Sequence, residues 1–350
     1  RKRPGRAGMK RVTQHALFWP ATTLVLLLIA SSVFNLQFLS LAWRDGHLYG
    51  SAIDILNRAA PLMVVSLGMT LVIAVRGLDI SVGAVVAIAA AVAALMIGGS
   101  FSASGEVASK FPLWLALGSA LAIAAACGLW NGLLVVKAGM QPIVATPILM
   151  VAGRGIAQLL TGGQIITVYY PPYFKLGNGF LAGLPVALWI AALLWAALHF
   201  LLSRTALGLF IRAIGGNPEA ARVAGVRSSA ITLCVYTFCG LAAGVAGLII
   251  SSNVKSADAN NAGQLLELDA ILAVTLGGTA LTGGRFTLAG TVLGALIIQT
   301  LTSMIYSLGV PPEVNLVVKA ALVFAVMLLQ SPEFRALVAG SARRTGAASK

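Results

Sequence analysis

Two basic residues lie inside long apolar stretches of the sequence, where a charge needs a specific partner. If those stretches are helices, Arg154 and Lys319 each lie about eight residues from the outer end of one, roughly 12 Å deep. Gln158 lies one turn from Arg154, and Asn315 lies one turn from Lys319. Ionisable groups at this depth face a bundle interior or a wet cavity, unless a long side chain reaches the surface. The two faces are therefore predicted to bind the hydroxyl groups of a solute, with internal pairing or surface exposure as alternatives.

Three further polar residues lie at the predicted inner ends of apolar stretches. Asp79 is suited to cap the helix that follows it, by accepting from the backbone of Ser81 or Val82, and a gating or coupling role is the alternative. Asn131 and Gln141 flank a turn between two stretches. We expect them to form hydrogen bonds between helices, with contact to a solute as the alternative.

A group of amides and carboxylates follows the seventh apolar stretch on its outer side. Solvation explains such a polar mouth, but these groups also suit recognition of a hydroxyl-rich solute such as a sugar, or docking of another protein. The residues are Asp258, Asn260, Asn261, Glu267 and Asp269.

Residues 203–228 form a charged segment in the middle of the apolar sequence. Asn217 is a good N-cap, Pro218 suits the first helical position and Glu219 favours the positive end of the helix. Ala220, Ala221 and Arg222 continue the helix, and Gly225 can adopt the left-handed conformation that ends it. The segment predicts a helix of about two turns whose small apolar face needs a groove, in this chain or on another protein.

Several kinds of chemistry have no residues to support them. The chain has no G-x-x-x-x-G-K-[ST] sequence for binding ATP. Its three histidines, His15, His47 and His199, have neither zinc spacing nor a triad arrangement. No carboxylate lies at the centre of an apolar stretch, where an ion-coupled carrier often has one. We therefore expect no enzymatic activity, no bound metal and no cofactor in this chain.

The composition identifies the elements that position these residues. Of 350 residues, 59% are hydrophobic and 10% are charged, whereas soluble domains carry about 25% charged residues. We predict an all-α integral membrane protein with about ten spans. The eighth is short and glycine-rich, which is typical of a broken or re-entrant helix buried against protein. The predicted spans are 17–39, 59–75, 80–99, 112–135, 140–161, 183–202, 229–251, 268–282, 287–306 and 313–330.

The basic residues predict the orientation of these spans. With both termini in the cytoplasm, 17 of the 24 lysines and arginines lie in inner segments and five lie outside. The segment 203–228 is then cytoplasmic, between a membrane domain 17–330 with basic tails at 1–16 and 331–350. The native start is expected upstream of Arg1. The excess of basic residues does not indicate nucleic-acid binding, because these residues flank apolar spans and form no basic face on a folded domain.

The chain resembles the permeases of ABC importers, and within them the ribose-type sugar permeases. Glu219-Ala-Ala-x-x-x-Gly225 is similar to the loop with which these permeases dock onto their ATPase. Further similar stretches are GLDISVG (77–83), WNG (130–132), QPIVAT (141–146), GRG (153–155), ELDAI (267–271) and GGTALTGG (277–284). Residues 45–61 and 257–263 resemble bacterial galactofuranose permeases in particular, whereas Pro147 and Arg285-Phe286 depart from the family pattern.

This resemblance implies a permease subunit of the ribose and branched-chain amino acid type in the bacterial inner membrane. It implies a separate ATPase subunit that holds ATP and magnesium, a periplasmic sugar-binding protein, and a second permease, expected to be a different chain. It also implies that residues 217–225 transmit ATP-driven movement to the spans. Galactofuranose is the expected sugar, with ribose or another sugar as the alternative. An ion-coupled transporter and a membrane enzyme are the other classes considered.

Overall fold

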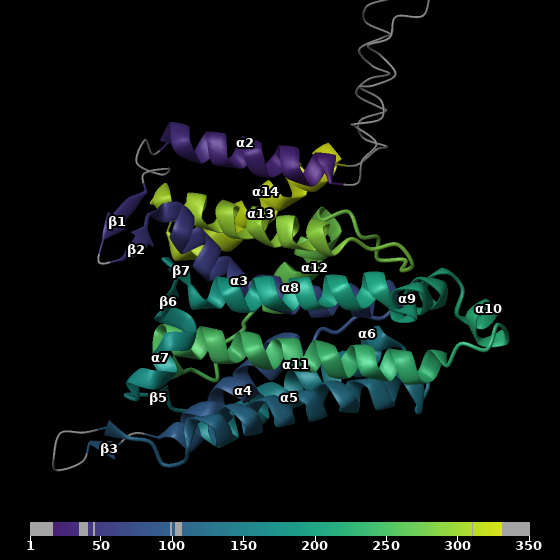
Figure 1. Cartoon of the computed structure of the whole chain (residues 1–350), viewed down its shortest axis with the longest axis horizontal. Coiled ribbons are helices and arrows are strands. Elements are labelled where there is room, and N and C mark those ends of the chain that lie inside the picture. The colour runs from purple at the N-terminus through teal and green to yellow at the C-terminus, as the bar shows by residue number, and fades with distance from the viewer. Residues whose placement is uncertain are drawn as a thin grey trace, which may run out of the picture.

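The computed structural model describes residues 17–34, 41–44, 46–98, 100–101, 107–309 and 311–330, so the predicted tails 1–16 and 331–350 lie outside the described residues. The described chain is a bundle of long helices that lie side by side (Figure 1). The helices are α2 (Phe18–Phe34), α3 (Ser51–Ala74), α4 (Val82–Ile97), α5 (Leu113–Val136), α6 (Pro142–Thr161), α7 (Pro171–Asn178), α8 (Val186–Arg204), α9 (Ala206–Gly216), α10 (Pro218–Val223), α11 (Ser228–Val254), α12 (Leu266–Leu276), α13 (Leu288–Ser307) and α14 (Pro312–Gln330).

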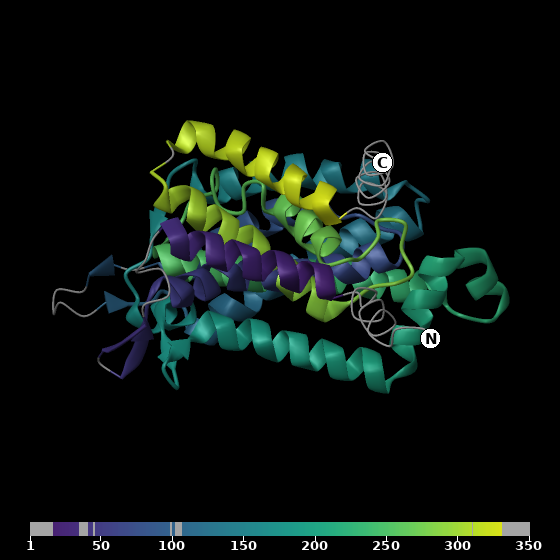
Figure 2. The same cartoon turned by 90° about the horizontal axis from the view of Figure 1, so that it is seen from above.

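Eight very short strands form four antiparallel pairs at one end of the bundle. They are β1 (Ala42–Arg44) with β2 (His47–Tyr49), β3 (Ser100–Phe101) with β4 (Val107–Ala108), β5 (Ile166–Thr167) with β8 (Ser256–Ala257), and β6 (Phe180–Leu181) with β7 (Leu184–Pro185). We call this the strand end and the opposite end, where α9 and α10 project, the α10 end (Figure 2).

Each predicted span corresponds to one helix, and six of the described helices are long and apolar enough to cross a membrane. Two predicted boundaries are wrong. The second span begins at Ser51 instead of 59, because the helix accepts Asp54 and Arg58 on exposed positions of its first turns. The eighth ends at Leu276 instead of 282, because positive φ values at Gly278, Gly283 and Gly284 end the helix and shape the loop.

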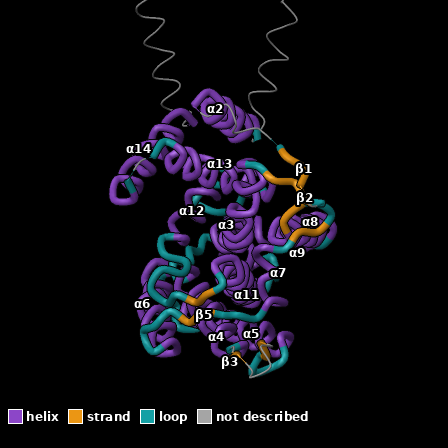
Figure 3. Tube along the Cα trace, turned by 90° about the vertical axis from the view of Figure 1, so that its left-hand side faces the viewer, coloured by secondary structure: helices purple, strands orange, loops and turns teal. Residues whose placement is uncertain are grey.

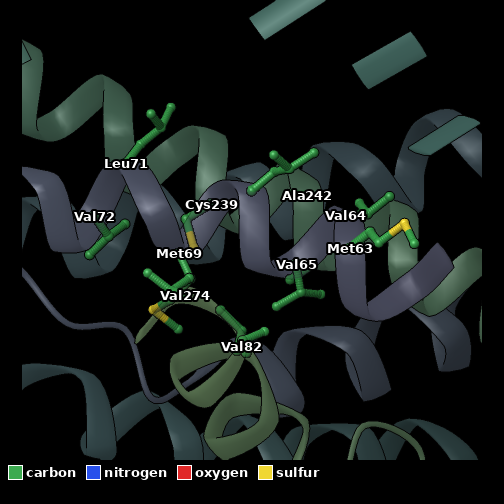
Figure 4. Packing of buried hydrophobic residues seen from close by; sticks show 14 of the residues in the cluster. Met63, Val64, Val65, Met69, Leu71, Val72, Val82, Cys239, Ala242 and Val274 are labelled. Carbon is green, nitrogen blue, oxygen red and sulfur yellow. The ribbon is translucent and has the colours of Figure 1, made fainter. Parts of the chain in front are cut away.

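The core of the bundle lies where α3, α4 and α11 meet. All of α4 is buried except Leu95 and Met96, which are half-buried. Side chains from α3, α11, α12 and the start of α4 interdigitate there (Figure 4). A helix enclosed on all sides can be apolar all round its circumference, which explains why the sequence of α4 has no polar face.

Glycines let α5 and α11 approach closely. A Cβ on Gly240 would lie 2.8 Å from the Cα of Gly128, and one on Gly128 would collide with the carbonyl of Tyr236. The close contact of these backbones replaces the side-chain packing that larger residues would provide.

Basic residues are more numerous at the α10 end than at the strand end. The described cations of the α10 end are Arg76, Lys137, Arg204, Arg212, Arg222, Arg227 and Arg285, and those of the strand end are Arg44, Arg58, Lys110, Lys175 and Lys255. This difference agrees in sign with the predicted cytoplasmic location of the α10 end, and the orientation itself stays a prediction.

Candidate functional site

The N-terminus of α10 is capped as the sequence predicted. Asn217 is the N-cap, and its Oδ1 accepts hydrogen bonds at 3.1 Å from the backbone N–H groups of both Glu219 and Ala220. Pro218 occupies the first helical position, where no N–H is needed. These contacts fix the start of a helix that is too short to be stable alone.

The C-terminus of α10 is closed by two backbone hydrogen bonds. The N–H of Gly225 donates to the carbonyl of Arg222, and the N–H of Val226 donates to the carbonyl of Ala221. Gly225 has a φ of +84°, the left-handed conformation that this double closure requires. Ala224 is the C-cap, so Gly225 follows it at the position where the sequence predicted a left-handed residue.

Helix α10 presents a surface with little of the protein around it. Ala221 is buried against the chain, whereas Val223 is 80% exposed and Leu209 of the preceding α9 is 68% exposed. Glu219 and Arg222 form an ion pair across one turn. The hydrogen bond and positive charge of Arg222 hold the pKa of the Glu219 carboxyl below its usual range, so the carboxylate stays ionised at neutral pH.

A backbone junction anchors the loop to the rest of the bundle. Arg76, directly after α3, has a φ of +63° and donates from Nε to the carbonyl of Gly215 at 2.7 Å and from Nη2 to that of Gly216 at 2.5 Å. The N–H of Gly284 donates to the carbonyl of Ala74 at 3.0 Å. The end of α9, the α3–α4 turn and the α12–α13 loop are therefore joined within a few ångströms.

The turn after Arg76 continues into a buried polar cluster. Asp79 is 1% exposed, and its Oδ1 accepts from the backbone N–H of Ser81 at 3.0 Å and from Nδ2 of Asn131 at 3.1 Å. The hydroxyl of Tyr236 donates to the carbonyl of Leu78. Asp79 thus makes the expected backbone contact, although Ser81 is the residue that precedes α4.

Asn131 and Gln141 have different environments. Asn131 is buried and joins α5 to the α3–α4 turn, as expected of a residue that forms hydrogen bonds between helices. Gln141 is exposed at the start of α6, and its backbone carbonyl accepts from the N–H groups of Val144 and Ala145.

Arg154 holds a loop that connects α11 with α12. Its Nη1 donates to the carbonyls of Ala259 at 3.0 Å and Ala262 at 2.6 Å. One turn along α6, the Nε2 of Gln158 donates to Oδ1 of Asn260 at 2.7 Å. Both predicted donors of α6 therefore contact the predicted polar mouth.

The carboxylates of the polar mouth are arranged differently from one another. Burial raises the pKa of Asp258, but hydrogen bonds from the Asn261 side chain and from the backbone of Asn260 and Asn261 outweigh it and leave the pKa below its usual range. Glu267 is 3% exposed, and its Oε2 has no hydrogen-bond partner among the described residues. It lies against Gly83, where a Cβ would collide with the carboxylate.

Lys319 forms an ion pair on another part of the bundle. Its Nζ lies 2.6 Å from Oδ2 of Asp269, and this contact joins α14 to α12. The side chain of Asn315 lies outside the described residues. The structure thus gives Lys319 and Arg154 separate protein partners, which corresponds to the alternative of internal pairing, and their role in a solute pathway stays a prediction.

Sequence reasoning assigned no role to two residues of the site. Arg76 contributed only to the 17 basic residues counted in the inner segments, and Tyr236 was not considered. The sequence around Arg76 gives little indication of its role, because an Arg-Gly pair at the end of an apolar stretch is compatible with any turn. Their roles depend on carbonyls about 140 and 160 residues away in the sequence.

Comparisons with known proteins cover nearly the whole chain. Residues 51–327 match the family described as branched-chain amino acid transport system / permease component. The chain is 48% identical over 327 residues to the galactofuranose transporter permease protein YtfT of Escherichia coli (strain K12), covering 92% of this chain and 93% of that protein.

Two other relatives have a lower identity. The fructose import permease protein FruF of Bifidobacterium longum (strain NCC 2705) is 36% identical over 98% of this chain and 95% of its own length. The ribose import permease protein RbsC of Escherichia coli (strain K12) is 36% identical over 79% of this chain and 84% of its own length. No solved structure matches the chain.

Proposed function

We propose that this chain, which belongs to the branched-chain amino acid transport system permease family, is the membrane subunit of an ABC importer that carries galactofuranose into the cytoplasm. The observation that carries the proposal is the similarity over 92% of the chain to a galactofuranose permease, at 48% identity against 36% for a fructose and a ribose permease. That the chain is an ABC sugar permease follows from all three relatives, and the choice of sugar depends on the first.

The surface of α10 supports a contact with a separate ATPase subunit. The helix is capped at both ends, projects beyond the bundle and exposes Val223. A short helix fixed in this way presents a defined apolar surface that a groove on another protein can accept. The chain has no ATP-binding motif, so ATP and magnesium belong to the ATPase, and this subunit contributes no catalysis.

The junction at Arg76 supports a route from α10 into the bundle. Movement of α10 would pull on the carbonyls of Gly215 and Gly216, which Arg76 binds from the α3–α4 turn. That turn leads within three residues to Asp79 and its contact with Asn131 on α5. A displacement of the loop would therefore reach two helices of the core through hydrogen bonds.

The strand end supports contact with the remaining partners. In the proposed orientation it faces the periplasm, and the termini and α10 end face the cytoplasm, across the inner membrane of a bacterium. Asn260, Asn261 and Asp258 are accessible there for a sugar or a sugar-binding protein. Opening of the contacts that Arg154 and Lys319 make would free their donors for sugar hydroxyls. A second permease, expected to be a different chain, would complete the pathway.

The proposal is tested by reconstituting the permease with its ATPase, second permease and binding protein in proteoliposomes. Uptake of radiolabelled galactofuranose is measured with and without ATP, beside ribose and galactopyranose. We expect ATP-dependent uptake that prefers galactofuranose. Equal uptake of ribose would remove the sugar assignment and leave the importer class, whereas uptake driven by an ion gradient without ATP would refute the class.

A further inference from the structure

An apolar groove runs along one side of the bundle between α8 and α13. Both helices pack on α3, and Figure 3, seen along the helices, shows α13 and α8 on adjacent sides of α3. Small residues, Ala191, Ala192 and Ala289, widen the gap to a cavity of about 410 Å³. Its floor includes Met63 of α3, and Leu296 lies along its α13 side.

The groove continues into a polar cavity at the α10 end. This second cavity of about 250 Å³ shares Ala289 with the first and is lined by Arg212, His199, Ser203 and Thr287. The apolar and polar parts are therefore adjoining sections of one channel on the surface of the bundle.

Arg212 is available to an anion at this position. Its guanidinium lies 5.4 Å from the centre of the Phe286 ring, and no carboxylate pairs with it among the described residues. A cation that stacks on a ring keeps its hydrogen-bond donors free at the edge of its plane. The hydroxyls of Ser203 and Thr287 donate to the backbone carbonyls of Phe200 and Gly277, so the guanidinium of Arg212 is the donor that this end of the channel offers to a phosphate group.

A second donor lies between the polar and apolar parts. The Nε1–H of Trp195 is buried on the lining of the groove and has no acceptor among the described residues. The Trp195 ring stacks on His199 one turn away, at 5.4 Å between ring centres. A buried indole N–H normally has an acceptor, and the ester carbonyls of a phospholipid lie between phosphate and acyl chain.

We propose that the channel between α8 and α13 binds an anionic phospholipid of the membrane leaflet at the α10 end. One acyl chain lies along the apolar groove, and the phosphate is bound by Arg212. The α8 lining runs from Leu188 to Ser203, about 22 Å at the helical rise, which equals about half of a bilayer including its head groups. A free phosphate would leave the apolar groove unfilled, and an apolar helix would leave Arg212 without an anion.

The lipid would bind to two parts of the proposed transport machinery at once. Arg212 lies on α9, directly before α10, whereas the groove belongs to α8 and α13. A bound anionic lipid would thus restrain α9 against the membrane domain. The assignment of the leaflet to the cytoplasmic side rests on the proposed function, but the site itself does not.

Native mass spectrometry of the purified, delipidated permease tests the site directly. Phosphatidylglycerol and phosphatidylcholine with identical acyl chains are titrated onto the protein in detergent. We expect phosphatidylglycerol to bind more tightly, and Arg212→Gln to weaken its binding about fivefold, the factor that one basic residue contributes near an anionic membrane surface. Arg204→Gln is the matched control, because Arg204 is exposed nearby and does not line the channel.

A second pair of variants tests the apolar groove. Ala192→Phe fills the groove and should reduce binding of both lipids, whereas Ala196→Phe adds the same ring to an exposed position of α8 outside the lining. Equal affinity for the two lipids, unchanged binding by Arg212→Gln, or displacement of phosphatidylglycerol by millimolar inorganic phosphate would overturn the proposal. The assay needs neither sugar nor ATPase, so its failure is distinct from failure of the transport function.

Discussion

The C-terminal closure of α10 allows a perturbation whose cost follows from backbone conformation alone. Gly225 has a φ of +84°, and a Cβ added there would have no heavy atom within 4 Å. Gly225→Ala therefore creates no clash, but it places an L side chain in the left-handed region at a cost of about 1–2 kcal/mol. Gly216→Ala is a matched control, because its site is equally open and its φ lies outside that region.

This strain energy destabilises α10 with its C-terminal closure formed, which we call the closed helix, and leaves the membrane core unchanged. A change of about 1–2 kcal/mol alters the ratio of closed to open helix about 5- to 30-fold. If the ATPase binds only the closed form, its affinity falls by at most that factor. The bundle should still insert, because none of the core contacts of α3, α4 or α11 involves Gly225.

The assay measures binding of the ATPase subunit to the reconstituted permease together with ATP hydrolysis stimulated by loaded binding protein. We expect both to fall for Gly225→Ala and to remain near wild type for Gly216→Ala, at equal membrane abundance and equal melting temperature. Wild-type affinity and stimulation in Gly225→Ala would refute the reasoning that the closed helix is the docking surface. Equal losses in both variants would show that any added methyl group disturbs the loop.

Three further predictions concern the contacts around this loop and at the strand end. Gly215→Ala would place a Cβ on the carbonyl oxygen of Ala74, so we expect a loss of about 1–3 kcal/mol in a thermal unfolding assay that Gly216→Ala does not show. Arg154→Met removes two charge-assisted hydrogen bonds to the 258–262 loop, each contributing about 1.5–3 kcal/mol. Amide hydrogen exchange at residues 258–265 should therefore accelerate. Unchanged exchange would contradict the assigned contacts. Lys319→Met leaves the Asp269 carboxylate unpaired and should cost up to about 3 kcal/mol. Adding Asp269→Leu should restore thermal stability, and recovery of uptake in that double variant would show that the pair is structural and not part of the sugar pathway.

The sequence by itself determined the class of the fold and most of its elements. Long apolar runs between polar breaks indicate helices in a bilayer, because every backbone group needs an internal partner there and barrel strands would alternate every second residue. The caps of α10 could also be predicted from the sequence, since Asn217, Pro218 and Gly225 act on backbone groups only a few residues away. The boundaries at Ser51 and Leu276 were predicted wrongly, because α3 carries Asp54 at an exposed position of its first turn and because the loop after α12 bonds to α3 through Gly284 and Ala74.

Only the tertiary structure decided which polar groups meet. The lengths of the apolar stretches predict how deep in the membrane Arg154 and Lys319 lie, but not which groups they bind. Arg154 binds the carbonyls of Ala259 and Ala262, and Lys319 binds the carboxylate of Asp269. Arg76 likewise binds carbonyls about 140 residues away. Every residue has a backbone carbonyl, so the residue types do not show which carbonyl a distant side chain will bind. Those partners are known only from the packing of the helices.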